Sequence, residues 1–332
     1  ANFYSKDHDI TFLVLKKKGE MINLLDKKVK IVSLDVDRIR NSLPKLIKIF
    51  RNINHSLIIS AMWPLNSIVM IASLFSSRTN KYFLTEHVNL SHSIGIDFKS
   101  NKFLILISIS LTYFLSKKII CVSNGVKKDI EKYYIFNKNK IHTIYNPLIS
   151  HKNSYTKKNN TKIQLLSVGT LKDQKDHKTL LKAFSLLDDY NSYHLNIVGD
   201  GNLKKDLIEM SIDLKINNHV TFHGYKENVD FYYKTCDIFI LSSLYEGFGN
   251  VLVEALAYGM QIISTNCNSG PSEILDNGKY GILVPINDPY QMSLSINKIL
   301  LKRFDPKLLM SRSEDFQISK IANNYLNLML KS

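Results

Sequence analysis

Two glutamates offer carboxylate chemistry in the stretch SSLYEGFGNVLVEALAYGMQIIST, residues 242–265. The apolar run that ends near this stretch predicts a strand at 237–243, and the pattern after it predicts a helix at 250–259. Glu246 lies in the loop between them and Glu254 lies within the helix. Open α/β sheets bind ligands at the carboxyl ends of their strands, so Glu246 is expected beside a ligand.

The loop between the two carboxylates is suited to a tight turn. Gly247 and Gly249 let the backbone turn and let a ligand approach the amides. Asn250 is predicted to cap the helix, and Phe248 is expected to pack. The Glu254 side chain leans back toward the loop, because helical side chains tilt toward the N-terminus.

Two carboxylates that face one site suit a ligand rich in hydroxyl groups, because a carboxylate can hold a vicinal diol. A phosphate would need a cation, and Lys175 follows a predicted strand at 163–169. The predicted helix start near His177 adds amide donors for an anion. The ordinary alternative is that the glutamates only stabilise a helix dipole.

Apolar strand-like runs alternate with longer helical patterns, which predicts parallel α/β units. In the first half, strands are predicted at 10–15, 29–34, 56–60, 81–85 and 118–122. In the second half, strands are predicted at 163–169, 193–199, 219–224, 237–243, 260–265 and 281–285. Helices are predicted at 176–189, 202–215, 228–235, 250–259, 270–277 and about 314–331.

A polar segment at 147–162 separates the two α/β patterns and is predicted to be a linker. The expected organisation is an N-terminal Rossmann-like domain, 1–150, and a C-terminal Rossmann-like domain, 160–312, that face a cleft. Residues 313–332 are expected to form a helix that packs back on the N-terminal domain. No Met and no strand precede the predicted strand at 10–15, so the first strand and its loop are expected upstream of residue 1.

Composition narrows the function classes. The three cysteines form no C-x-x-C pair, which argues against a disulfide framework or zinc ribbon and indicates a reducing compartment. The net charge of +15 is compatible with an anionic membrane face, phosphorylated substrates or simply a Lys-rich composition. Basic and aromatic residues are not interleaved, so no nucleic acid is expected. The apolar run 103–115 is shorter than the ~20 residues that span a bilayer, so it predicts a buried helix, with an interfacial helix as the alternative.

The stretch YEGFGNVLVEALAYG resembles the Glu-x7-Glu motif of retaining glycosyltransferases of the GT-B fold, family 4. The likeness continues through LLSVGTLKDQKDHKTLLKAF, LNIVGDGNLKKDL, VTFHGYKENVDFYYKTCDIFILSS and GPSEIL. In the first half, CVSNGVKKDI and IHTIYNPL are also similar. The resemblance extends from residue 9 onward and is more specific in the second half.

The resemblance implies a retaining transfer of a sugar from a nucleotide diphosphate, expected to be UDP, to a glycan acceptor. Glu254 would bind the ribose diol, Glu246 the donor-sugar hydroxyls, and Lys175 the leaving diphosphate. His87, after the strand at 81–85, would lie near the reacting sugar. No residue is an evident covalent nucleophile, so the acceptor is expected to attack on the face that the leaving group departs from.

The family's donor pocket would extend to the small residues that follow several strands. Gly199 and Gly201 form a G-x-G without a third glycine, for which a plain tight turn is the alternative. Gly270 could donate an amide to phosphate or only shape its turn. The donor-binding residues implied by the resemblance, besides Glu254, are Gly169, Thr170, Gly199, Gly201, Gly247, Phe248, Gly249, Asn250 and Gly270.

Two features depart from other transferase patterns. Thr170 stands where the family often has an Arg that holds phosphate, so Lys172, Lys178 or backbone amides would have to substitute. The DVD at 35–37 is interpreted as a helix cap, because acidic metal motifs belong to another transferase architecture. No metal and no cofactor are therefore expected.

The acceptor is expected to be linked to polyprenyl diphosphate and used in O-antigen or capsule synthesis. The location would be the cytoplasmic, inner face of the cell membrane. One alternative is an NAD-dependent sugar-nucleotide epimerase or dehydrogenase, which needs a full G-x-G-x-x-G and a Y-x-x-x-K. Another is a non-catalytic remnant that binds sugar nucleotides, which Thr170 keeps open.

Overall fold

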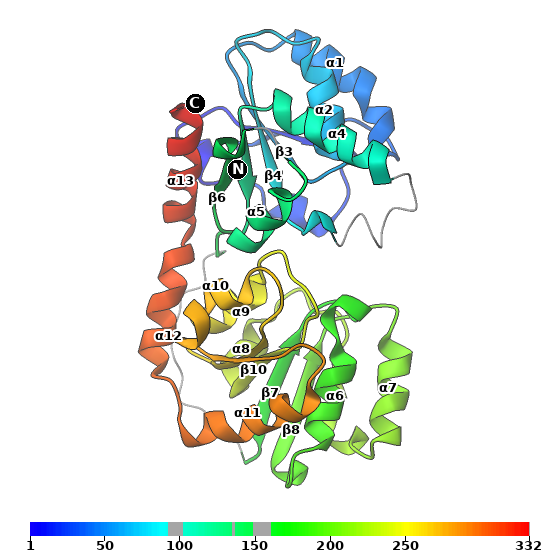
Figure 1. Cartoon of the computed structure of the whole chain (residues 1–332), viewed down its shortest axis with the longest axis vertical. Helices are drawn as coiled ribbons and strands as arrows, with labels where there is room; N and C mark the ends of the chain where they lie inside the picture. Colours follow the sequence, from blue (N-terminus) through cyan, green and yellow to red (C-terminus); the bar gives the residue numbers. More distant parts are fainter. Residues whose placement is uncertain (92–101, 135–136, 149–160, 332) are drawn as a thin grey trace. The chain divides into compact units, whose positions relative to one another are not determined.

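Helices and parallel strands alternate along the computed structural model, which describes residues 1–91, 102–134, 137–148 and 161–331 (Figure 1). These residues form two compact units. The N-terminal unit consists of Ala1–Pro147 with Ile318–Ser332, and the C-terminal unit consists of Leu148–Gln317. Most of the predicted linker at 147–162 lies outside the described residues.

The N-terminal unit contains two parallel sheets. In the first, β1 (Thr11–Val14) pairs with β2 (Lys30–Ser33). The second has the order β3 (Leu57–Ala61), β4 (Lys81–Glu86), β5 (Lys118–Cys121) and β6 (Ile141–Thr143). The five predicted strands are confirmed. The sixth, β6, was not predicted, because a strand of three residues is too short to show an apolar pattern.

Helices surround these sheets. The α-helices are α1 (Leu43–Arg51), α2 (Leu65–Ser73), α4 (Lys102–Leu115), α5 (Asn124–Ile130) and α13 (Ile318–Leu330), and the 3-10 helices are η1 (Tyr4–Lys6), η2 (Glu20–Leu24), η3 (Ile39–Ser42) and η4 (Lys138–Lys140). Ser123 caps α5, since its hydroxyl accepts a hydrogen bond from the Val126 amide at 3.1 Å.

The C-terminal helix α13 belongs to the N-terminal unit. Its Ile321 packs in a cluster with Ile120 and Ile144. The Tyr4 hydroxyl donates to the Ala322 carbonyl at 2.6 Å. The two ends of the chain are therefore joined within one unit.

The apolar run at 103–115 forms α4, but the expectation of a buried helix is correct for one face only. Ile109 and Tyr113 are buried, whereas Leu111 and Phe114 are exposed. Within the described residues, no helix combines the length and apolar character needed to cross a bilayer.

The C-terminal unit is built on one parallel sheet of six strands with helices on its faces. The sheet order is β12 (Ile282–Val284), β11 (Gln261–Thr265), β10 (Ile238–Leu241), β7 (Ile163–Val168), β8 (Tyr193–Val198) and β9 (Val220–Phe222). The strands are nearly continuous apolar runs because both faces are covered. The α-helices are α6 (His177–Ser185), α7 (Lys204–Asp213), α8 (Asp230–Thr235), α9 (Asn250–Ala257), α10 (Pro271–Ile274), α11 (Pro289–Leu301) and α12 (Pro306–Ser313), and the 3-10 helices are η5 (Asp173–Lys175), η6 (Tyr190–Ser192), η7 (Asn217–His219), η8 (Asp276–Gly278) and η9 (Glu314–Phe316).

The order of this sheet creates a topological switch point. The chain moves outward from β7 to β8 and β9, then returns to β10 on the other side of β7. The loops after β7 and β10 therefore leave their strands in opposite directions and open a crevice at the carboxyl edge. Both loops carry residues that the sequence singled out.

The helices that follow β11 differ from the prediction in their bounds, and two of them were missed. The predicted helix 270–277 stops at Ile274, because Asn277 is left-handed with φ 53°. The helix α11 was missed. Its start does carry a cap, since the Asp288 side chain accepts a hydrogen bond from the Gln291 amide at 2.9 Å. The predicted helix at about 314–331 is confirmed as α13 from Ile318 to Leu330, with the 3-10 turn η9 in place of its first turn, whereas α12 before it was missed.

Candidate active site

Lys175 and Glu246 meet at the switch point of the C-terminal sheet. The Lys175 Nζ lies 2.6 Å from the Glu246 Oε1, and both side chains are mostly buried. Lys175 ends the loop that follows β7, and Glu246 lies in the loop that follows β10. Because β7 and β10 are neighbours in the sheet, two residues 71 positions apart come into contact.

Further hydrogen bonds hold the two loops together. The Leu244 amide donates to the Gln174 carbonyl at 2.8 Å, and the Gln174 side-chain amide donates to the Tyr245 carbonyl at 2.8 Å. The Ser242 hydroxyl donates to the Lys175 carbonyl at 2.8 Å. The ion pair therefore lies on a fixed backbone frame.

The pair leaves hydrogen-bonding capacity on both partners. Glu246 uses only its Oε1, which accepts from Lys175 and from the Ser243 hydroxyl at 2.7 Å. Its Oε2 accepts no hydrogen bond from the described residues. An ammonium has three N–H donors, and Lys175 gives one to Glu246. The site can thus present a carboxylate oxygen to a hydroxyl and N–H donors to an anion.

Glu254 lies on α9 and is held by a different element. Its Oε2 accepts a hydrogen bond from the Tyr233 hydroxyl of α8 at 2.7 Å. Burial and the nearby Glu254 carboxylate raise the pKa of Tyr233 well above its usual value, so this tyrosine stays a donor. The ring of Tyr233 is stacked on Tyr258 at 5.4 Å, which fixes the donor hydroxyl beside Glu254.

The predicted cap of α9 was wrong. Gly249 occupies the N-cap position with φ 100°, and Asn250 is the first residue of the helix. A left-handed residue is needed there to bring the chain from the loop into the helix, and glycine meets that need at least cost. Gly247 has no positive φ.

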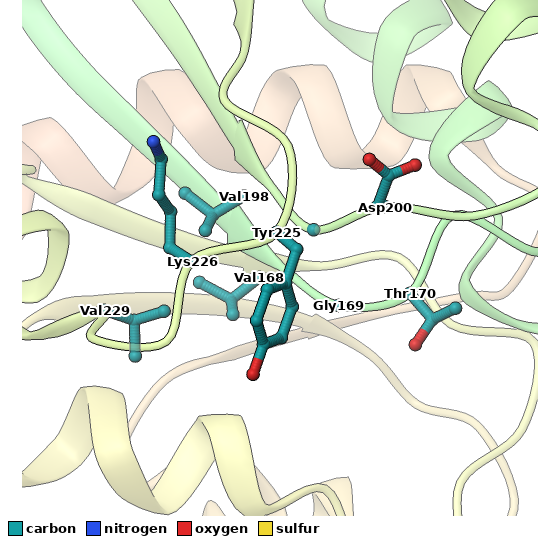
Figure 2. A pocket seen from close by; sticks show the side chains of 9 residues that line it. Val168, Gly169, Thr170, Val198, Asp200, Tyr225, Lys226 and Val229 are labelled. Carbon is teal, nitrogen blue, oxygen red and sulfur yellow. The ribbon is translucent and has the colours of Figure 1, made fainter. Parts of the chain in front are cut away.

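A pocket of about 250 Å³ opens at the carboxyl ends of β7 and β8 (Figure 2). Of the predicted residues, Gly169, Thr170 and Gly199 line it. Six other lining residues were not predicted, which are Val168, Val198, Asp200, Tyr225, Lys226 and Val229.

The missed wall of the pocket is the segment between β9 and α8. Tyr225, Lys226 and Val229 all follow the predicted strand 219–224, so the strand-end rule could have found them. In Figure 2, the Tyr225 ring projects across the pocket and Lys226 points the other way. Apolar walls with one flat ring suit a planar heterocycle.

Two glycines form the wall between β8 and β7 by close backbone approach. A Cβ on Gly199, whose φ is 143°, would lie 1.9 Å from the Gly169 carbonyl oxygen. A Cβ on Gly201 would lie 2.4 Å from the Leu171 carbonyl oxygen. Gly199 thus shapes the pocket through packing of the main chain, whereas Gly201 does not line it.

Gly270 and Phe248 pack on each other and contribute little side chain to the crevice. Gly270 has φ 89°, and a Cβ there would lie 1.7 Å from the Phe248 carbonyl oxygen. Its amide lies 3.5 Å from the Glu273 carboxylate. The Phe248 ring is buried and meets Phe316 edge-on at 5.6 Å. Of the two interpretations of Gly270, the geometry supports the shaping of the turn.

Lys175 is flanked in the chain by the two lysines that were expected to substitute for the missing arginine. Thr170, Lys172 and Lys178 are exposed. The start of α6 is capped by Asp176, whose side chain accepts from the Thr179 amide at 3.2 Å. One of the amides expected for an anion is therefore already used.

His177, the first residue of α6, is buried beside Lys175. Burial, and then the charge of Lys175, lower its pKa to about 4. It is thus neutral and adds no charge to the site.

In the N-terminal unit, His87 directly follows β4. Its Nε2 lies 3.0 Å from the Thr85 hydroxyl, which in turn donates to the Ser60 carbonyl at 3.1 Å. Because the Thr85 proton is committed, His87 must donate through Nε2 and keep a lone pair on Nδ1. Burial lowers the pKa of His87, so the ring is neutral near pH 7.

Glu86, the last residue of β4, is buried beside His87. Its Oε1 accepts from the Asn66 amide at 2.7 Å, and its Oε2 accepts from the Trp63 backbone amide at 3.4 Å. Burial raises the pKa of Glu86 to about 7 against these stabilising hydrogen bonds. The carboxyl group joins the loop after β3 to the end of β4.

The acidic DVD segment is not a helix cap, which corrects that interpretation. Arg38 occupies the N-cap position of η3, with no side-chain hydrogen bond. Asp35 accepts from the Ser33 hydroxyl at 2.6 Å, and Asp37 pairs with Lys16. Across the described residues, no three His, Cys, Asp or Glu side chains cluster as a metal site would need.

Two parallel α/β units, one with a switch-point crevice, define a transferase of the GT-B class. The family described as glycosyl transferases group 1 matches residues 151–315, and the one described as glycosyltransferase family 4 matches residues 4–149. The chain belongs to glycosyltransferase family 4.

Individual proteins agree with this assignment. The N-acetylgalactosamine-N,N'-diacetylbacillosaminyl-diphospho-undecaprenol 4-alpha-N-acetylgalactosaminyltransferase of Campylobacter jejuni is 26% identical over 80% of this chain and 73% of its own length. The lipopolysaccharide outer core galactosyltransferase WaaB has a similar structure, with a TM-score of 0.75, 20% identity, and 92% and 85% of the two chains covered. Anabaena HepE, solved with UDP and with UDP-glucose, gives a TM-score of 0.78 at 15% identity, covering 100% of this chain and 94% of its own.

The contact between Gly270 and Phe248 generates a stability prediction. Gly270→Ala should lower the free energy of unfolding of the C-terminal unit by more than about 2 kcal/mol, because the new methyl group meets a backbone oxygen. Gly278→Ala is the matched control, since Gly278 has φ 99° but nothing within 4 Å of a Cβ. Urea unfolding followed by circular dichroism compares the two; equal losses would contradict the steric explanation.

Glu86 generates a pH prediction. Its pKa is higher in the folded state than in the unfolded chain, so its contribution to stability is lost as pH rises from about 4.5 to 7. Glu86→Gln should remove about 3 kcal/mol of that pH dependence. Trp63, the single tryptophan, contacts Glu86 and reports urea unfolding of this unit by fluorescence.

The control for Glu86→Gln is Asp9→Asn, a neutralised carboxylate on the surface of the same unit. It should leave the difference in unfolding midpoint between pH 5 and pH 8 as in the wild type. A Glu86→Gln protein with an unchanged pH difference would show that Glu86 does not titrate in this range.

Proposed function

We propose that this family 4 glycosyltransferase moves a hexose-type sugar, with retention, from a UDP-sugar to a lipid-linked glycan in surface polysaccharide synthesis. The observation that carries the proposal is the Lys175–Glu246 pair at the switch point, with an apolar pocket beside it. The pair places a carboxylate oxygen that can accept a hydrogen bond from a sugar hydroxyl next to an ammonium group that can donate hydrogen bonds to phosphate.

The donor would lie along the carboxyl edge of the C-terminal sheet. The uracil ring fits the pocket lined by Val168, Val229 and Tyr225. The ribose diol would reach Glu254, whose Oε1 accepts no hydrogen bond from the described residues and whose Oε2 is fixed by Tyr233. The helix that carries Tyr233 begins directly after Val229, so one short segment supports both contacts.

The diphosphate and the sugar would use the ion pair. Two Lys175 N–H donors would face the diphosphate oxygens, and the Glu246 Oε2 would accept from the sugar hydroxyls beside the reacting carbon. Negative charge grows on the leaving phosphate during transfer, so a fixed ammonium lowers the barrier. With Thr170 in place of an arginine, Lys172, Lys178 or backbone amides near Lys175 would have to complete the phosphate contacts.

The reaction we propose needs no covalent enzyme intermediate. The bond from the anomeric carbon to the diphosphate oxygen breaks, and the acceptor oxygen bonds to that carbon on the same face. The acceptor proton passes to the departing phosphate oxygen. His87, neutral with its Nδ1 lone pair available, would accept a hydrogen bond from a hydroxyl of the reacting sugar. Neither a metal nor a cofactor is required.

The relatives' names support the acceptor class. The Campylobacter protein is named for an undecaprenol diphosphate acceptor, and WaaB for the lipopolysaccharide outer core. A lipid-linked acceptor and an inner-membrane-face location for this chain follow by analogy. The family assignment favours transfer over an NAD-dependent epimerase, and the intact ion pair favours catalysis over a binding remnant.

The two glutamates should differ kinetically. Glu246→Gln should lower kcat by on the order of 10²–10³, because it weakens contacts at the reacting sugar. Glu254→Gln should instead raise the donor KM about tenfold or more, because it weakens a ribose contact that is made throughout the reaction. Transfer from radiolabelled UDP-sugars to bacterial membranes measures both effects.

The matched control is Glu209→Gln, an exposed glutamate on α7. It should leave kcat and KM unchanged. A Glu246→Gln enzyme with wild-type turnover would overturn the assigned role, and inversion at the anomeric carbon in the product would overturn the retaining mechanism.

The pocket predicts how UDP binds. Tyr225→Ala should weaken UDP binding about tenfold, because base stacking contributes roughly 1–3 kcal/mol. Tyr225→Phe keeps the ring and should bind UDP as the wild type does. Calorimetric titration with UDP measures both; equal losses in the two variants would assign the effect to the hydroxyl and contradict stacking.

A further inference from the structure

The outer face of α4 exposes a row of large apolar side chains. Ile107, Leu111, Phe114 and Leu115 have the spacing of one helical face. Leu111 is 57% exposed and Phe114 is 55% exposed. A helix at the surface of a protein ordinarily turns such a face toward the core.

The inner face of the same helix carries hydroxyl groups that are already bonded. The Ser108 hydroxyl accepts from the Trp63 indole N–H at 3.2 Å, and the Thr112 hydroxyl donates to the Ser67 hydroxyl at 2.8 Å. Packing against α2 therefore uses Ser108 and Thr112 as well as Ile109. The apolar outer row takes no part in these contacts and is exposed to solvent over a large part of its area.

The end of α2 extends the apolar surface. Residues 63 and 67 contact residues 108 and 112 in the same order, so α2 and α4 run in the same direction, side by side (Figure 1). Directly after α2, Leu74 is 64% exposed and Phe75 is also exposed. We call the following residues the apolar patch: Leu74, Phe75, Ile107, Leu111, Phe114 and Leu115.

Cations border this patch. Lys140 donates to the Phe114 and Ser116 carbonyls at 2.8 and 2.9 Å, and its ammonium lies 5.6 Å from the Phe114 ring centre. Lys117 and Lys118 lie near enough to Lys140 to lower its pKa, after the larger effect of burial. The Arg51 guanidinium lies 5.7 Å from the ring centre of Phe75, another member of the patch.

Acidic residues are missing from the chain segments that build this surface. The segment 38–85, which supplies α1 and α2, contains no Asp or Glu, and neither does the segment 102–128, which supplies α4. A second copy of the chain would bring two positive borders together, which charge repulsion opposes. A bilayer of anionic lipids complements the patch in two ways: its head groups attract the bordering cations, and its acyl chains accept the apolar side chains.

We propose that the apolar patch docks the N-terminal unit on an anionic lipid bilayer, with α4 lying in the membrane plane. The Leu, Ile and Phe side chains would enter the boundary of the acyl chains, and Lys117, Lys140 and Arg51 would contact the head groups. This inference rests on the proposed function in one respect. A lipid-linked acceptor lies in a membrane, so an enzyme that uses it has a reason to bind there.

The test compares binding of variants to lipid vesicles. Wild-type protein should float with vesicles of phosphatidylglycerol and phosphatidylcholine in equal parts, and bind phosphatidylcholine vesicles far less. The double variant Leu111→Gln/Phe114→Gln should lose at least about tenfold in partition coefficient, because two exposed apolar side chains no longer enter the bilayer. Lys117→Gln should weaken binding at low salt, and its deficit relative to the wild type should shrink as salt is raised, because salt screens the lost attraction.

The matched control is Ile212→Gln on α7 of the C-terminal unit, where Ile212 is 55% exposed. It should bind vesicles as the wild type does. UDP titration keeps the two hypotheses apart, since the double variant should bind UDP normally. No wild-type binding to anionic vesicles, or equal losses from the double variant and Ile212→Gln, would overturn the proposal. So would a wild-type dimer in lipid-free solution that the double variant abolishes.

Discussion

The ion pair between Lys175 and Glu246 depends on the order of strands in the C-terminal sheet. Only because β10 returns to the side of β7 do the two loops leave adjacent strand ends. Each charge lies in a mostly buried position where it would be costly alone, so each makes the position of the other tolerable. The hydrogen bonds through Gln174 and Ser242 then hold the loops at the separation that this pair requires.

Much of this site could be predicted from the local sequence. Apolar runs locate strand ends, and Lys175, Glu246 and the glycine positions all follow such ends. The contact between Lys175 and Glu246 could not be predicted in this way, because local patterns do not specify which strands are neighbours. The same limit hid Tyr233, which supports Glu254 from another helix.

Backbone conformation accounts for the other differences. Asn250 is a residue type that often caps helices. The loop reaches α9 through a left-handed residue, however, so Gly249 occupies the N-cap position. The apolar run of α4 illustrates the same point for burial. Its composition predicts a helix in contact with apolar surroundings, and only the hydroxyl contacts of Ser108 and Thr112 show which face turns inward.

Gly199 and Gly201 lie against the main chain of Gly169 and Leu171 with no room for a side chain. A substitution at either glycine would therefore have to move a strand end. The segment 225–229 instead contributes the Tyr225, Lys226 and Val229 side chains to the pocket, so in the proposed function a substitution there would alter the nucleotide site without this clash. To change the donor specificity of the enzyme, this segment should be randomised and the glycines should be kept.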